Sequence, residues 1–504
     1  MLKISDADIR KRIERDNFWW MSDAKPIPEA KYPKRVYFEP FRNIALNFKV
    51  KRATVLLGPR RVGKTFMIKQ LIHETISDGF NPSRILFASI DAPIYSGMSL
   101  ESFIEFLPDD KNKEQYLVVF DEIQYLKNWE IHLKDLVDSF PNIKFVATGS
   151  AAAALKLKSA ESGAGRFSDF MLPPLTFYEF LLFIGADSEL IENSEKKSIA
   201  GRRYYRTNDI EKLNNLFIDY LNYGGYPEAV LNEEVRQNSE QFIRNDIIDR
   251  VLLKDLPSLY GIKDIPDLNK LFLFLAYNAG NEASLEKISQ GSGISKPTIT
   301  KYITYLESAF LIIKISTVDE NCKTLQRERN FKIYLNNPSM RAALFGPVEA
   351  SDTTRIGHLT ESAIFSQWQH ASNFRNLRYS RWKNEGEVDI VYLEGPTQKA
   401  AWIGEIKWSD GIEKSQQKNL MSMRTLITNH ASIKEGFFTT KTKSGGVMIA
   451  GKPVEILPSS LYCYTIGRNI TNNLKHESDP GDWTDIDSLE DHSFSDDDWT
   501  DAAE

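Results

Sequence analysis

The chain of 504 residues has only two cysteines, Cys322 and Cys463, and no metal-ligand spacing connects them. This disfavours structural zinc and a disulfide framework, and it is typical of a reducing compartment. No apolar run approaches the roughly 18 residues that span a bilayer, and the first residues lack an apolar signal-peptide core. No Ser/His/Asp grouping and no paired thiols support peptidase or redox chemistry. We therefore expect a cytoplasmic protein with no membrane partner.

Basic residues are absent from the end of the chain. Between Glu477 and Glu504 there are twelve Asp or Glu and no Lys or Arg, whereas the whole chain has a net charge of −6. Without that segment the formal charge is +6, so the remainder is mildly basic, which is compatible with nucleic acid but weak evidence for it. The acidic tail contains DWTD twice and is predicted to be disordered. It could bind a protein partner, mimic nucleic-acid phosphates, or only increase solubility.

The length predicts roughly three or four domains. Pattern changes along the chain divide it into a helical and aromatic N-terminal segment (1–50), a P-loop domain (51–174), a helical domain (175–280), a winged helix-turn-helix (281–345), a nuclease-like domain (346–474) and the acidic tail (475–504). Within 51–174, short apolar runs alternate with helical stretches, at 54–57, 85–90, 117–120 and 145–148. That alternation predicts a parallel sheet covered on both faces.

The segment from Gly58 to Thr65 reads GPRRVGKT and matches the phosphate-binding pattern G-x-x-x-x-G-K-[ST] without a mismatch. It follows an apolar strand and opens a helix, which is the context that the motif requires. Gly58 and Gly63 permit backbone angles that point N–H groups inward, and the helix N-terminus favours anions. We expect Lys64 to reach the β- and γ-phosphates of ATP, Thr65 to ligate Mg²⁺, and Arg61 to belong to the nucleotide-binding loop.

A second motif, LVVFDE, ends an apolar strand with Asp121 and Glu122. We expect Asp121 to hold Mg²⁺ through water and Glu122 to polarise the attacking water. A third apolar strand ends at Ser150, which is interpreted equally well as a γ-phosphate sensor or as a helix N-cap. Arg166 follows a glycine-rich loop and is interpreted either as an arginine finger or as a solvated surface residue.

Five segments in this order resemble a bacterial and archaeal AAA-type ATPase family: GPRRVGKT, FDEIQYLKNW, ATGSAAAALKLKSAESGAGRF, PLTFYEFL and YGGYPEAVL. Members of that family join a P-loop module to a domain of unknown function, and some end in a restriction-endonuclease-like domain. The resemblance covers roughly 41–407. It implies an AAA-like core in which Lys64, Thr65, Asp121 and Glu122 have the roles given above and Arg166 is the family's arginine. The charged segment at 192–209 and the acidic tail depart from the family pattern, which leaves assembly and regulation open.

A helix-turn-helix is predicted from Ser284 to Ser308, with a turn around Gly291–Ile294. Its core would be formed by Leu285, Ile288, Ile294, Ile299, Ile303 and Leu306. Short polar residues would then occupy the exposed face of the second helix, as a groove-reading helix requires: Ser295, Lys296, Thr298, Thr300 and Lys301. Because only two lysines lie on that helix, the unit is interpreted either as a DNA-binding element or as a packing module.

Carboxylates with the spacing of a PD-(D/E)xK phosphodiesterase occur near the C-terminus. Glu361 lies on the apolar stripe of a predicted helix, where a carboxylate is costly unless it is paired or bound to metal. Asp389 lies on a strand, and Glu405 and Lys407 share one face of the next strand. The three carboxylates are candidate ligands for Mg²⁺ or Mn²⁺, and Lys407 is a candidate for orienting the attacking water. An ordinary α/β domain with surface carboxylates is the alternative.

These observations predict an α/β protein with an AAA-like P-loop parallel-sheet domain, a helical and winged-helix middle, a restriction-endonuclease-like C-terminal domain and a disordered acidic tail. The leading hypothesis is an ATP-hydrolysing protein that binds DNA and cleaves nucleic acid with a metal ion, for which defence or mobile-element biology is an analogy only. The alternative is a nucleotide-controlled switch that binds a DNA or protein partner and has an inactive nuclease-like domain. Homo-oligomers are compatible with either hypothesis.

Overall fold

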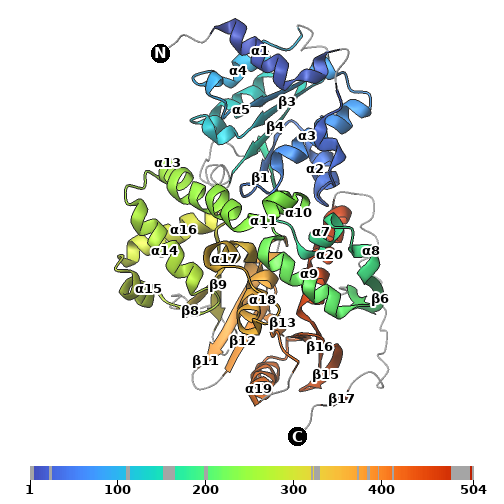
Figure 1. Cartoon of the computed structure of the whole chain (residues 1–504), viewed down its shortest axis with the longest axis vertical. Coiled ribbons are helices and arrows are strands. Elements are labelled where there is room, and N and C mark those ends of the chain that lie inside the picture. The colour runs from blue at the N-terminus through green and yellow to red at the C-terminus, as the bar shows by residue number, and fades with distance from the viewer. Residues whose placement is uncertain are drawn as a thin grey trace. The chain divides into compact units, whose positions relative to one another are not determined.

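The computed structural model describes residues 5–21, 25–108, 114–150, 165–197, 203–318, 322, 330–371, 374–382, 386–395, 397–410, 414–477 and 500–501. The chain divides into two compact units, Met1–Pro173 and Pro174–Glu504 (Figure 1). Within the described residues, no helix is long and apolar enough to cross a membrane. The acidic tail predicted at 475–504, with its two DWTD sequences and its predicted disorder, lies outside the described residues except for 475–477 and 500–501.

The first unit is built on a parallel five-stranded sheet with the order β2-β3-β4-β1-β5. Its strands are β1 (Ala53–Leu57), β2 (Ile85–Ser89), β3 (Tyr116–Asp121), β4 (Ile143–Gly149) and β5 (Phe167–Met171). Every residue of β1, β3 and β4 is buried, which explains why these strands read as continuous apolar runs. The predicted parallel sheet is therefore confirmed, with β5 as an additional strand.

The strands of this sheet alternate along the chain with helices α3 (Lys64–Ser77), α4 (Leu100–Ile104) and α5 (Trp129–Ser139). The first fifty residues belong to the same unit and form α1 (Asp6–Asp16), η1 (Phe18–Trp20), η2 (Pro28–Lys31) and α2 (Phe38–Ala45). Asn17 exchanges hydrogen bonds with the backbone N–H and carbonyl of Phe87, at 2.6 and 2.8 Å. Because β2 is an edge strand, Asn17 satisfies backbone groups that would otherwise be open to another strand.

The second unit begins with helices, as expected for 175–280, but the charged segment within them forms a hairpin. The helical elements are α7 (Phe177–Phe183), α8 (Asp187–Leu190), α9 (Ile210–Tyr223), α10 (Pro227–Leu231), α11 (Glu233–Gln237), α12 (Ser239–Phe242), η7 (Ile243–Asp249), η8 (Val251–Asp255), α13 (Leu256–Tyr260) and α14 (Ile265–Tyr277). The hairpin consists of β6 (Ile191–Lys197) and β7 (Arg203–Thr207), which pair antiparallel.

A helix-turn-helix with a β wing follows. Strand β8 (Glu282–Ala283) precedes α15 (Leu285–Ser292) and α16 (Lys296–Ser308), and β9 (Ile312–Val318) and β10 (Phe331–Leu335) form the wing. Gly293 ends α15 with a φ of 76°, and Ser295 caps α16 through the N–H of Thr298. The left-handed angle at Gly293 turns the chain between the two helices.

The remaining elements of the second unit are helices and strands, and all of these strands lie in one sheet with the wing. They are α17 (Pro338–Phe345), α18 (Thr353–Trp368), η9 (Phe374–Asn376), β11 (Leu377–Trp382), β12 (Gly386–Leu393), β13 (Ala400–Glu405), α19 (Lys414–Asn429), β14 (Glu435–Thr440), β15 (Gly445–Ile449), β16 (Lys452–Pro458), α20 (Ser459–Glu477) and β17 (Thr500–Asp501). The strand order is β17-β15-β16-β14-β13-β12-β11-β9-β10-β8. Pairing of β9 with β11 therefore makes the wing continuous with the C-terminal strands.

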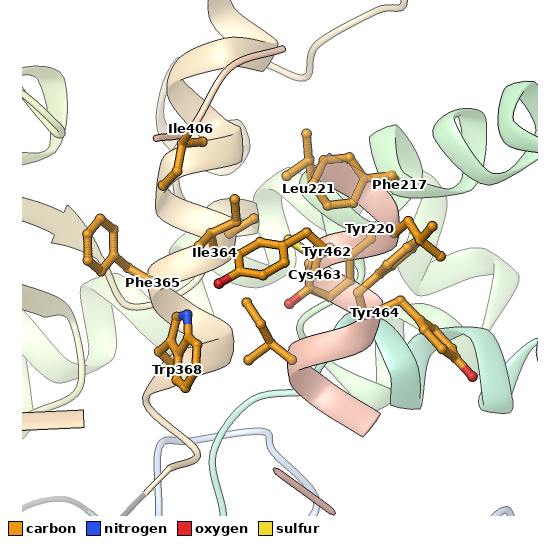
Figure 2. Close-up of a cluster of buried hydrophobic side chains, with 14 of the residues drawn as sticks. Phe217, Tyr220, Leu221, Ile364, Phe365, Trp368, Ile406, Tyr462, Cys463 and Tyr464 are labelled. Atoms are coloured by element: carbon orange, nitrogen blue, oxygen red, sulfur yellow. The ribbon is translucent and has the colours of Figure 1, made fainter. Parts of the chain in front are cut away.

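The helices of 175–280 share a hydrophobic core with the C-terminal elements (Figure 2). Phe217 and Tyr220 on α9 lie in one buried cluster with Phe365 on α18 and Tyr464 on α20. Gln367 on α18 donates a hydrogen bond to the Tyr220 hydroxyl at 2.8 Å. Tyr334 on β10 belongs to the same cluster, so packing joins all three predicted segments of this unit, 175–280, 281–345 and 346–474.

Candidate functional site

The loop from Gly58 to Gly63 connects β1 to α3 and adopts the backbone angles that its glycines were expected to permit. Gly63 has a φ of 95° and lies at the N-cap of α3, and Arg61 is also left-handed at 64°. A Cβ atom on Gly58 would lie 2.2 Å from the carbonyl oxygen of Leu172. A side chain at position 58 would therefore clash with the backbone of Leu172, and Gly63 has a left-handed angle that favours glycine at the turn into α3.

Lys64 is buried, and its Nζ donates to the carbonyls of Gly58 and Pro59 at 3.1 and 2.8 Å. Thr65 donates from Oγ1 to Oδ2 of Asp121 at 3.0 Å. The lysine therefore lies within the loop whose N–H groups would receive phosphate, and the hydroxyl and carboxylate expected to share Mg²⁺ are in contact. Arg61 is exposed on the same loop.

Asp121 ends β3 and is buried beside two hydroxyl groups. Its second oxygen accepts a hydrogen bond from Thr148 at the end of β4, and Thr148 Oγ1 also accepts the N–H of Glu122 at 2.9 Å. Burial, together with the neighbouring Glu122 carboxylate, raises the pKa of Asp121 to about 6. A nearby cation would stabilise the charged form of this buried carboxylate. Asp121 and Thr65 also supply the oxygen ligands that Mg²⁺ prefers.

Glu122 directly follows β3 and has a left-handed backbone, with a φ of 55°. Gln124 donates to Oε2 of Glu122 and accepts the backbone N–H of Ser150 at 3.1 Å. Ser150 is buried, and its backbone is thereby linked to the acidic pair. The structure thus gathers Lys64, Thr65, Asp121, Glu122 and Ser150 at the carboxyl edge of the parallel sheet.

Arg166 lies at the other edge. It immediately precedes β5, and β5 runs parallel to β1 with Ala53 opposite Phe167 and Leu57 opposite Met171. Since a strand rises about 3.3 Å per residue, the backbone of Arg166 lies roughly 20 Å along the strand direction from the start of the P-loop at Gly58. Its Nε pairs with Oδ1 of Asp138 at 2.5 Å. Arg166 therefore lies away from the P-loop of its own unit, and its role as an arginine finger, in its own chain or in a neighbouring copy, stays a prediction.

The C-terminal candidates lie on adjacent elements of the second unit. Asp389 is on β12 and Glu405 ends β13, which pairs with β12 antiparallel. Lys407 lies just beyond β13, and its Nζ contacts Glu405 Oε1 at 2.6 Å and Asp389 Oδ2 at 3.2 Å. Glu361 on α18 is partly exposed and accepts a hydrogen bond from the Tyr334 hydroxyl at 3.0 Å. We call Glu361, Asp389, Glu405 and Lys407 the carboxylate cluster.

A further cation, Lys332 on β10, contacts this cluster. Its Nζ lies 2.6 Å from Glu387 Oε1 and 3.3 Å from Asp389 Oδ1, and its side chain is 4% exposed. Although burial opposes both shifts, Lys407 and Lys332 hold the pKa of Asp389 well below its usual range, and Tyr334 and Asp389 raise that of Lys332. Burial and the charge of Asp389 raise the pKa of both Glu361 and Glu405.

The carboxylate cluster has the donor chemistry of a divalent-cation site but not its arrangement. Oε2 of Glu405 is buried without a hydrogen-bond partner, which is a vacant oxygen ligand. Nevertheless, over the part of the chain that the structure describes, no three His, Cys, Asp or Glu side chains are placed to hold a metal ion together. Two ammonium groups occupy the oxygens of Asp389 instead.

The polar face predicted for the helix-turn-helix is exposed on α16. Ser295, Lys296, Thr300 and Lys301 are exposed and Thr298 is partly exposed, whereas Ile299, Ile303 and Leu306 are buried. Lys296 forms an ion pair with Glu286 on α15 at 3.1 Å. This face therefore has two surface cations, one of which is partly neutralised by a neighbour.

Comparison with known families assigns the P-loop region. Residues 50–181 match the model of an AAA domain. The chain carries an AAA domain. A second match, to a domain of unknown function, covers residues 214–351 and includes the winged helix. The expected order of an AAA domain followed by a domain of unknown function is therefore confirmed, and neither match extends to Asp389.

Relatives match the chain at low identity. An uncharacterised protein of Haemophilus influenzae is 27% identical over 313 residues, which are 60% of this chain and 72% of the relative. An uncharacterised protein of Methanocaldococcus jannaschii is 26% identical over 362 residues, 69% of this chain and 74% of the relative.

Among solved structures, the S. cerevisiae Hsp104–ADP complex matches with 14% identity and a TM-score of 0.29, covering 55% of this chain and 39% of that chain. The replication initiator DnaA bound to AMPPCP and single-stranded DNA matches with 12% identity and a TM-score of 0.26, covering 54% of this chain and 88% of that chain.

Three residues near the two sites were missed by sequence reasoning. Arg35 is buried in the unit of the AAA domain and donates to the carbonyls of Val62 and Pro173, at 2.8 and 2.9 Å. Gln124 lies two residues after Glu122, within the segment FDEIQYLKNW, and no pattern in that segment singles it out. Lys332 was detectable as a charged residue within an otherwise apolar strand, FKIYL.

Proposed function

We propose that this chain hydrolyses ATP in its AAA domain and couples nucleotide state to an action on DNA. The observation that carries the ATP-hydrolysis part of this proposal is the hydrogen bond from Thr65 to Asp121, because it joins the end of the phosphate-binding motif to the acidic strand. Neither motif alone would require this contact. The matching AAA domain supports the same assignment.

Each residue of this site has a proposed task. Lys64 contacts the β- and γ-phosphates, Thr65 and Asp121 hold Mg²⁺, and Glu122 orients and deprotonates the attacking water. Bound Mg²⁺ supplies charge neutralisation to the transferred phosphoryl group. Thr148 and Gln124 keep the two carboxylates in separate positions, because each donates to one of them.

ATP turnover by the purified full-length chain tests this assignment. Lys64→Ala is expected to abolish nucleotide binding, whereas Glu122→Gln is expected to bind ATP and lose turnover. Lys51→Ala is a suitable control, since Lys51 is an exposed lysine that precedes β1. Turnover that survives in Glu122→Gln would remove the proposed water-orienting role and leave the chain as a nucleotide-binding protein.

For the action on DNA, we propose that α16 contacts the duplex and that the carboxylate cluster cleaves nucleic acid with Mg²⁺ or Mn²⁺. The exposed polar face of α16 supports the first step. A helix, a hairpin and the Glu405–Lys407 pair on adjacent elements support the second, together with the vacant Oε2 of Glu405.

A second candidate function is a nucleotide-controlled switch with an inert C-terminal site. The ion pairs of Asp389 with Lys332 and Lys407 favour it, since they fill the positions that a metal would need. Cleavage assays with Mg²⁺ or Mn²⁺, with and without ATP, distinguish the two functions. Asp389→Ala should abolish cleavage, and Glu394→Ala, an exposed carboxylate after β12, should not. Absent cleavage with intact ATP turnover would contradict the nuclease proposal and support the switch.

A further inference from the structure

Two side chains of the wing contact the carboxylate cluster. Lys332 and Tyr334 are alternate residues on β10, so they project from the same face of that strand. Lys332 pairs with Asp389 on β12, and Tyr334 donates to Glu361 on α18. One short strand therefore contacts two of the three candidate metal ligands, although it is distant from both in sequence.

Lys332 contacts a carboxylate oxygen that a divalent cation would need as a ligand. Lys332 Nζ forms an ion pair with Oδ1 of Asp389 at 3.3 Å, and Lys407 Nζ forms one with Oδ2 at 3.2 Å. Oδ2 also accepts the backbone N–H of Ile406 at 3.1 Å. Lys332 holds Glu387 as well, at 2.6 Å. Both oxygens of Asp389 are thus engaged by cations that the chain itself provides, while Oε2 of Glu405 has no partner.

An ammonium group and a divalent cation compete for the same carboxylate oxygens. Each is favoured by the negative charge of the cluster, and each repels the other strongly in a buried environment. Of the two lysines, Lys407 is 28% exposed and follows the strand that carries Glu405, whereas Lys332 is 4% exposed and arrives from the wing. Lys332 is consequently the cation whose presence depends on the position of another structural element.

We propose that Lys332 is an internal cation that keeps a divalent metal ion out of the carboxylate cluster while β10 stays in place. The inference rests on the proposed C-terminal metal site and adds a condition for its use. Strand β9 follows α16 directly and pairs with β10, so a displacement of the wing moves Lys332. Metal binding at Asp389 and the position of the wing are then thermodynamically linked. Displacement of the wing would raise the metal affinity, and bound metal would favour the displaced wing by the same free energy.

Binding of Mn²⁺ to the nucleotide-free full-length chain, measured by titration with detection of free Mn²⁺, tests this inference. Lys332→Met is expected to bind one Mn²⁺ at least about tenfold more tightly than wild type, which is the usual size of an effect from a residue beside a metal ligand. The gain should disappear in Lys332→Met/Asp389→Asn. Lys314→Met is the matched control, because Lys314 lies on the neighbouring wing strand β9 and stacks on Phe331.

Two further variants separate charge from packing. Lys332→Arg keeps the positive charge and should bind Mn²⁺ no better than wild type, whereas Lys332→Gln should gain affinity as Lys332→Met does. If the neutral variants unfold without metal, recovery of a cooperative melt in Mn²⁺ is the expected result, and no recovery would overturn the inference. Tight Mn²⁺ binding by wild type that requires Asp389 would overturn the inference while leaving the metal site intact. Weak binding by every variant would remove the metal site itself.

Discussion

The side-chain amide of Gln124 donates a hydrogen bond to the carboxylate of Glu122, two residues earlier in the chain. The same side chain accepts the backbone N–H of Ser150, at the end of β4, at 3.1 Å. Gln124 thus fixes Glu122 against a neighbouring strand, while Glu122 itself has a left-handed backbone that no regular element supports. The amide of Gln124 therefore positions the carboxylate of the proposed water-orienting residue, and Thr148 Oγ1 holds its backbone N–H.

Replacing Gln124 with Ala should lower ATP turnover with little change in KM. Without the amide, Glu122 samples rotamers that do not face the attacking water, and we expect kcat to fall about tenfold to a hundredfold. Steady-state kinetics measures the effect. In a Glu122→Gln background, which is expected to bind ATP without turnover, the same substitution should leave ATP binding unchanged, and a loss of ATP binding there would show that Gln124 acts elsewhere.

Gly58→Ala should destabilise the first unit and prevent nucleotide binding. The new Cβ would lie 2.2 Å from the carbonyl oxygen of Leu172, so the P-loop or the end of β5 must shift. Such overpacking costs about 1–3 kcal/mol or more. Thermal melting and ATP binding measure the result.

Gly357→Ala provides the contrast for that substitution. Gly357 lies inside α18, and a Cβ there would meet no atom within 4 Å. We expect this variant to be about 0.5–1 kcal/mol more stable, since Ala is the better helix former. Equal destabilisation by both changes would show that the Leu172 carbonyl is not the cause.

The nucleotide site could be predicted from sequence because its residues are local to two motifs. Gly58 to Thr65 are consecutive, and Asp121 ends a strand whose neighbours run parallel, so their meeting at one sheet edge followed from the fold. Arg166 could not be placed in the same way. Its position depends on β5 pairing with β1 in a parallel register, and the short, partly exposed strand at 167–171 has no strong apolar signal.

The C-terminal site was predictable only in part. Asp389 and Glu405 come together through a hairpin, which sequence spacing indicates. Lys332 is 57 residues from Asp389 and belongs to a different predicted domain, so no local pattern connects them. A lysine within the apolar run FKIYL would need an anion nearby if that run is buried, but the pattern does not identify the anion. The boundary predicted at residue 345 hid this contact, since β10 lies before it and the carboxylates after it.

The buried Lys144 should make the stability of the first unit rise with pH. Lys144 on β4 donates to the carbonyl of Arg52 at 2.9 Å, and burial lowers its pKa from 10.5 to about 8. Between pH 8 and 10.5 the unfolded chain binds the proton and the folded chain does not, so unfolding becomes less favourable as pH rises. The full effect is at most about 3 kcal/mol.

Denaturant unfolding of wild type and Lys144→Met at several pH values isolates this contribution. The stability of wild type relative to Lys144→Met should increase from pH 8 to pH 10.5 and be constant below pH 7. Lys49→Met removes an exposed lysine and should follow wild type throughout. A constant difference between wild type and Lys144→Met would show that Lys144 keeps an ordinary pKa.

Removing both cations from the exposed face of α16 should weaken DNA binding through phosphate contacts. Lys296 and Lys301 are exposed, and the ion pair of Lys296 with Glu286 is a surface pair that contributes little to stability. Each lysine that contacts a phosphate contributes about 0.9 to the slope of log affinity against log salt. Lys296→Ala/Lys301→Ala should therefore reduce that slope by about 1.8 and lower affinity most at low salt. Lys270→Ala on α14 removes an exposed lysine away from this helix and should leave the slope unchanged. An unchanged slope in the double variant would assign the winged helix to packing within the second unit, where its buried face already contributes to a hydrophobic core.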